Sequence, residues 1–145
     1  MGETEKIKHL VAYYTKTFKT RDPFEIADRL GILYQIGNCK YEGSYMFLKN
    51  HRYIFLSNKL NDIDLKLVMA HELGHALLDR KENCYFIRNK TFLQNSKLER
   101  RANTFAAHLL IDDNLLFEYQ SFTREQFSDC MVYPEELIKL RLKTK

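Results

Sequence analysis

Two histidines and a glutamate stand together near the middle of the sequence, in the run His71-Glu72-Leu73-Gly74-His75. On an α-helix, side chains four residues apart project from one face, so both imidazoles could reach a single Zn²⁺ at about 2.0–2.1 Å. Glu72 would then contact a water at the open coordination position without filling that position itself. The run therefore has the chemistry of a hydrolytic zinc centre, with two metal ligands beside a general base.

A plainer interpretation of the same run is a helix with two partly buried histidines and a solvated glutamate. The H-E-x-x-H pattern arises by chance on the order of once in a hundred chains of this composition. Catalytic zinc sites have three protein ligands and one open position. A third ligand is therefore the feature that separates the two interpretations.

The flanking residues predict a helix over residues 62–79. Asn61 or Asp62 can cap its N-terminus, and Asp62 and Asp64 place negative charge where the helix dipole favours it. Gly74 is unusual inside a helix, where it costs roughly 1 kcal/mol relative to alanine. We expect it to let another segment approach closely. The apolar positions follow a helical stripe, with Ile63, Leu67, Ala70, Leu73 and Leu77.

Glu99 is the best candidate for the third ligand. It falls in a second predicted helix, residues 97–111, for which Ser96 is a plausible N-cap. Ser96-x-x-Glu99 is also a capping box, in which the carboxylate would only bond back to the Ser96 amide. The residues alone leave both roles open.

Two further polar residues of this helix bear on the site. Asn103 lies one turn beyond Glu99 on the same face, where it could hydrogen-bond the second nitrogen of a ligand histidine and fix its tautomer. His108, nine residues past Glu99, turns to the opposite side of the helix. We expect His108 at the surface or a rim rather than among the ligands.

Both segments resemble the ImmA/IrrE-type metallopeptidases, whose members pair A-H-E-L-G-H-A-L-L with a downstream E-x-x-A-[ND]-x-F-A-A-x-L-L. Here Ala70–Leu78 matches the first string and Glu99–Leu110 the second. The resemblance implies that His71, His75 and Glu99 hold zinc and that Glu72 is the catalytic base. It covers most of the chain and fades toward the C-terminus. The sequence departs from the family at Ile111-Asp112, where Met-Pro is usual, which affects the local turn rather than the chemistry.

The resemblance also implies a function. Family members are known or suspected to cleave helix-turn-helix repressors in bacteria and their mobile elements, in prophage, integrative-element or stress-response circuits. A small domain like this one is similar to the phage or mobile-element kind, so we expect a zinc-dependent endopeptidase with a repressor as its protein substrate. The alternative is a zinc-binding anti-repressor or toxin–antitoxin component that binds without cleaving. A purely structural zinc site is disfavoured, because the three cysteines show no C-x-x-C spacing.

Composition limits the remaining classes of protein to which the sequence could belong. A chain of 145 residues with 45% hydrophobic content predicts one domain spanning residues 1–145. Neither an 18-residue apolar stretch nor a signal peptide is visible, and three cysteines without close pairs suit the cytoplasm. The net charge of +4 is mild. We expect no membrane and no direct nucleic-acid partner, with the Arg100-Arg101 pair and the Lys139–Lys145 tail forming solvated helix faces.

The remaining elements predict an α+β, zincin-like fold, in which a small antiparallel or mixed sheet of about three strands packs against the zinc-binding helix and further helices. The hairpin over residues 45–57 is the candidate edge for an extended peptide, or else a plain structural hairpin. The expected helices cover residues 4–19 and 22–31, with two or three more after residue 112, one capped by Thr123-x-x-Gln126 and one opened by Pro134; strands are expected at 32–37, 45–48 and 53–57, and a loop of about fifteen residues follows residue 79.

Overall fold

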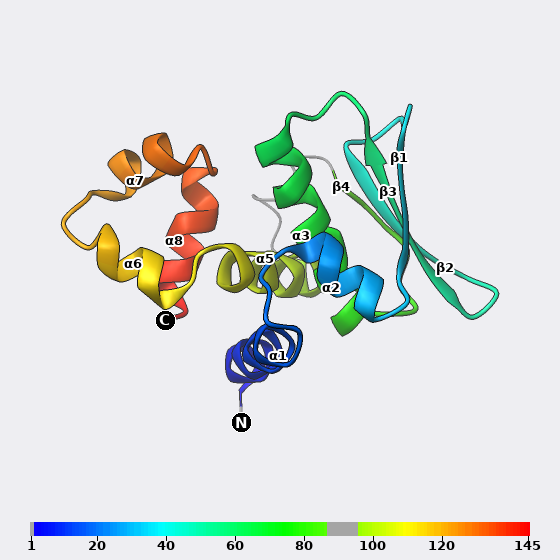
Figure 1. The fold of residues 1–145 in the computed structure, drawn as a ribbon, viewed down its shortest axis with the longest axis horizontal. Helices are drawn as coiled ribbons and strands as arrows, with labels where there is room; N and C mark the ends of the chain where they lie inside the picture. Colours follow the sequence, from blue (N-terminus) through cyan, green and yellow to red (C-terminus); the bar gives the residue numbers. More distant parts are fainter. Residues whose placement is uncertain (1, 87–95) are drawn as a thin grey trace.

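A computed structural model of the chain describes residues 2–86 and 96–145, and within them the predicted α+β class is confirmed (Figure 1). The sheet has four strands, one more than expected. The helices are α1 (Glu3–Phe18), α2 (Pro23–Arg29), α3 (Asp62–Leu78), α5 (Lys97–Leu110), α6 (Asp113–Glu118), α7 (Arg124–Met131) and α8 (Glu135–Lys143). The strands are β1 (Leu33–Gly37), β2 (Gly43–Leu48), β3 (His51–Ser57) and β4 (Cys84–Phe86).

The sheet has the strand order β1-β3-β2-β4, with β3 parallel to β1 and antiparallel to β2, and β2 antiparallel to β4. Lys49 and Asn50, both at positive φ, turn β2 into β3. The expectation that this hairpin forms an edge is wrong, because β1 and β4 flank it on both sides. Strand β4 lies inside the segment that we expected to be a loop. It was not predicted because its three residues are too few to show the alternating pattern of a strand.

Helix α3, which carries the H-E-x-x-H run, lies against one face of the sheet and is buried throughout from Leu67 to Ala76. The side chain of Asn61 accepts a hydrogen bond from the Asp64 amide and so caps its N-terminus. Helix α5 packs along α3 and contacts α1 and α8 on its other sides. In Figure 1, α5 runs between the half that holds the sheet and the half that holds α6, α7 and α8. No described helix is long and apolar enough to cross a membrane.

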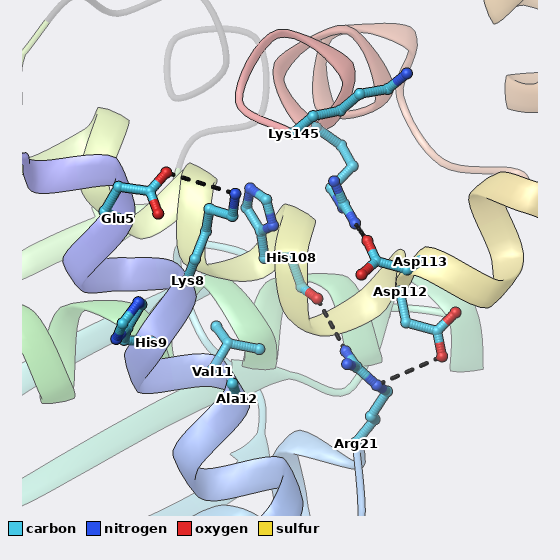
Figure 2. A pocket seen from close by; sticks show the side chains of 11 residues that line it. Glu5, Lys8, His9, Val11, Ala12, Arg21, His108, Asp112, Asp113 and Lys145 are labelled. Carbon is cyan, nitrogen blue, oxygen red and sulfur yellow. Dashed lines mark hydrogen bonds and ion pairs between the residues drawn. The ribbon is translucent and has the colours of Figure 1, made fainter.

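Two arginines hold the C-terminal end of α5 at a polar pocket of about 370 Å³ (Figure 2). Arg21 donates to the carbonyl oxygens of His108 and Leu109, both at 2.9 Å, and Arg141 donates to that of Ile111 at 2.6 Å. Positive charge is favourable at a helix C-terminus. Arg141 is only 3% exposed, so the prediction that the C-terminal tail forms a solvated helix face is wrong for this residue. His108 lines this pocket and is not among the candidate ligands, as expected, but it is buried rather than at the surface.

The local signals of the C-terminal half are confirmed where the structure tests them. Asp112 caps α6 by accepting from the Leu115 amide at 2.8 Å, and Ile111 is fully buried, so the departure from Met-Pro is accommodated in the turn. Thr123 and Gln126 form a capping box at the start of α7, and α8 begins directly after Pro134.

Candidate metal centre

Three potential ligand side chains converge between α3 and α5. Nε2 of His71 lies 3.0 Å from Oε2 of Glu99, and Nε2 of His75 lies 3.1 Å from Oε1 of Glu99. The two Nε2 atoms are 3.0 Å apart, and all three residues are buried. Ligand atoms bound to a tetrahedral zinc at about 2.0–2.2 Å lie roughly 3.3–3.5 Å from one another. The three side chains therefore fit one zinc ion after shifts of a few tenths of an ångström.

The hydrogen-bonding pattern leaves the correct nitrogen of His71 free for a metal. Nδ1 of His71 donates to Oδ1 of Asn103 at 2.8 Å. Because a neutral imidazole carries one proton, Nε2 then presents a bare lone pair toward the other two donors. Burial lowers the pKa of His71, which keeps the ring in this neutral form.

The charge state of Glu99 also suits a ligand. Burial raises the pKa of this carboxyl, but the close approach of the His71 and His75 rings outweighs burial and lowers it to about 2. Oε2 of Glu99 is buried and lies 3.0 Å from Nε2 of His71, which carries no proton in the tautomer that Asn103 sets. Two imidazoles and one carboxylate around a common point form the donor set of a catalytic zinc site.

The structure separates the two roles that the sequence left open for Glu99. Its backbone amide donates to Oγ of Ser96 at 3.2 Å, so Ser96 is the N-cap of α5. The carboxylate, in contrast, points at the two histidines and not back at the cap. Only the serine half of the predicted capping box is formed.

Glu72 is not the solvated glutamate of the plainer interpretation. It is fully buried, and neither carboxylate oxygen has a hydrogen-bond partner among the described residues. Burial, and then the charge of Glu99, raise its pKa well above the usual value. A carboxylate in this environment has a high affinity for protons, which suits a general base.

Gly74 explains how the two helices come close enough for this cluster to form. A Cβ atom at this position would lie 3.1 Å from Cα and 3.2 Å from the carbonyl oxygen of Ala102, and 3.2 Å from Cβ of Phe105. The expectation that Gly74 permits close approach of another segment is confirmed. An ion pair between Arg101 and Asp79 joins α5 to the end of α3 beside this contact.

Two sheet residues beside the cluster were not among the predicted site residues. The ring of Phe86 on β4 lies edge-on to His71, with 5.0 Å between ring centroids. Gly43 on β2 lies against Glu72. Gly43 lies before the strand expected at residues 45–48, although a glycine in a strand can mark a close approach, and Phe86 falls inside the expected loop. Tyr45 on β2 is fully buried and donates its hydroxyl proton to the carbonyl of Arg80.

Comparisons with known proteins relate this chain to a peptidase family and to two proteins of Bacillus and its phage. The sequence model of the Peptidase_M78 family, described as the IrrE N-terminal-like domain, matches residues 15–141. The "Uncharacterized immunity region protein 2" of Bacillus phage phi105 is 34% identical over 144 residues, which cover 97% of this chain and 91% of that protein. The "Metallopeptidase ImmA" of Bacillus subtilis (strain 168) is 30% identical over 129 residues, covering 84% of this chain and 75% of the relative.

Proposed function

This chain belongs to the Peptidase_M78 family, and from that premise we propose that it is a zinc-dependent endopeptidase whose substrate is a helix-turn-helix transcriptional repressor. The observation that carries the proposal is the convergence of His71, His75 and Glu99, whose donor atoms lie within 4.8 Å of one another. A relative whose name refers to a phage immunity region supports a phage or mobile-element regulatory circuit. In this proposal the protein acts in the cytoplasm, where it would meet a repressor.

Each polar side chain of the site has a role in this proposal. His71, His75 and Glu99 hold the ion, and Asn103 fixes the ring of His71 through its Nδ1 proton. A zinc ion bound there supplies a Lewis acid that polarises the scissile carbonyl and acidifies the attacking water. Glu72 accepts the proton of that water and delivers it to the nitrogen of the leaving amine.

Among the described strands, β4 is the last of the sheet on this side, and we assign it to the substrate in place of the central hairpin. Its partner β2 occupies one side, while Phe86 contacts His71, so this edge lies next to the candidate metal centre. An extended peptide that pairs with an edge strand gains backbone hydrogen bonds while its alternate side chains enter pockets. Such pairing would present one peptide bond of the substrate to Glu72 and the ion.

The test is to incubate the zinc-loaded protein with repressors encoded near its own gene, with and without a chelator. We expect one repressor to be cut, and cleavage to stop with the chelator or with Glu72→Gln. A repressor that binds but stays intact with fully loaded wild-type protein would contradict the proposal. That outcome would favour the non-cleaving anti-repressor instead.

A further inference from the structure

One row of the sheet has a gap in its layer of side chains at the place where Glu72 lies. In this row Gly43 of β2 is paired with Leu56 of β3 on one side and with Phe86 of β4 on the other. Leu56 and Phe86 are both fully buried. Two large side chains therefore border a position that has none, and the row forms a notch that faces α3.

Helix α3 fills the notch with two residues that lie one turn apart. A Cβ atom at position 43 would meet Cγ1 of Val68 at 2.4 Å, and Cγ and Oε1 of Glu72 at 3.4 and 3.5 Å. The first distance is a hard overlap. The other two are van der Waals contacts, and they put a methyl group directly beside the carboxylate.

We propose that Gly43 is a positioning residue for the base, because its bare backbone lies against the Glu72 side chain and forms one wall of the space that holds the carboxylate. This inference rests on the proposed function. Both oxygens of Glu72 are buried and lack a protein donor among the described residues, so the carboxylate is held by shape and not by hydrogen bonds. The backbone of Gly43 supplies part of that shape.

A simple glycine-to-alanine change would mix two effects. Val68 is β-branched and fully buried, so it has few alternative rotamers, and the overlap at 2.4 Å would push α3 away from the sheet. Shortening Val68 to alanine removes Cγ1 and with it the overlap. The contact between position 43 and Glu72 then remains by itself.

The experiment compares zinc-loaded Val68→Ala with the double variant Gly43→Ala/Val68→Ala. The probe is acetohydroxamate, a small molecule that chelates zinc through two oxygens and donates a proton to a neighbouring carboxylate. Binding of the probe, zinc affinity and thermal unfolding are measured for each protein. Gly37→Ala is the matched control, because it makes the same change in a strand where a Cβ would meet nothing within 4 Å.

We expect Gly43→Ala alone to lower Tm, and the double variant to unfold at the temperature of Val68→Ala. Zinc affinity should be equal in these last two proteins. Acetohydroxamate should bind the double variant about five- to tenfold more weakly than it binds Val68→Ala, as when one hydrogen bond to a charged group is weakened. Gly37→Ala should bind the probe as the wild type does.

Equal probe affinity in Val68→Ala and the double variant would overturn the inference, since Gly43 would then serve only to accommodate Val68. A wild-type protein that takes up zinc and binds the probe but cleaves no repressor would contradict the proposed function alone. A wild-type protein that takes up no zinc would overturn both.

Discussion

Asn103 accepts a hydrogen bond from Nδ1 of His71 at 2.8 Å, across the interface between α5 and α3. The bond sets the tautomer of His71 from the same helix that carries Glu99, so a change in the packing of α5 affects both candidate ligands.

We expect Asn103→Ala to weaken zinc binding by about 10–100-fold, the range seen when a ligand histidine loses its hydrogen-bond acceptor. Asn103→Asp keeps an acceptor oxygen at the same place and should retain most of the affinity. Competition with a chromophoric chelator measures both. Equal zinc affinity in the wild type and Asn103→Ala would show that packing alone orients His71.

Glu72→Gln should retain about one zinc per chain and lose cleavage, because an amide cannot accept the proton. The same variant has a consequence for the metal-free protein. Since burial raises the pKa of Glu72 above the usual 4.5, the folded chain loses stability as pH rises through and above that value. Metal-free Glu72→Gln should therefore have a higher Tm than the wild type at pH 7 and a smaller difference at pH 4. Retained cleavage would remove Glu72 from the mechanism.

Glu99 and Ser96 offer a matched pair of substitutions on one helix turn. Glu99→Ala should lower zinc affinity by orders of magnitude, because the ion loses one of three ligands. Ser96→Ala removes the N-cap and should cost about 1 kcal/mol of stability without changing zinc affinity. Chemical denaturation and zinc competition on both variants separate the two effects. Unchanged zinc binding in Glu99→Ala would assign Glu99 to structure.

The local part of this site could be predicted from the sequence, and the long-range part could not. H-E-x-x-H has helical spacing within one element, and Ser96, Asn61 and Thr123 cap the helices as expected. Strand β4 could not be predicted, because it exists only through pairing with β2, and its absence made the hairpin look like an edge. Arg141 was misassigned for a similar reason, since its partners lie thirty residues away at the end of α5.

Gly74→Ala tests how closely α5 must approach α3. Alanine is the better helix former by about 1 kcal/mol, so the substitution would stabilise the protein if space were available. Here the new methyl group would meet the backbone of Ala102 at 3.1–3.2 Å, and we expect a net loss of about 1–3 kcal/mol from overpacking. Zinc affinity should fall as well, because Glu99 moves with α5. Thermal unfolding with and without zinc gives both values, and a rise in Tm would contradict the close packing.

His108 lies at the pocket of Figure 2, at the other end of α5 from the metal centre. Thr144 donates its hydroxyl proton to the carbonyl of Leu140, so the hydrogen bond of 2.8 Å between Thr144 and Nε2 of His108 has the imidazole as donor. The ring is therefore satisfied in its neutral form. Burial, and then the charges of Arg141 and Lys8, lower its pKa to about 4.

A histidine held neutral in this way makes stability depend on pH. Between pH 6.5 and about 4 the unfolded chain binds a proton at His108 that the folded chain does not, so stability from this residue is complete above pH 6.5 and is lost as pH falls. The full effect corresponds to roughly 3 kcal/mol, and solvent at the pocket rim should reduce it to roughly 1–2 kcal/mol. Metal-free His108→Gln should therefore lose less Tm than the wild type between pH 7 and pH 4.5. His9→Gln, which removes an exposed imidazole lining the same pocket, should follow the wild-type curve. Parallel curves for His108→Gln and the wild type would show that His108 is protonated as easily in the folded chain as in the unfolded one.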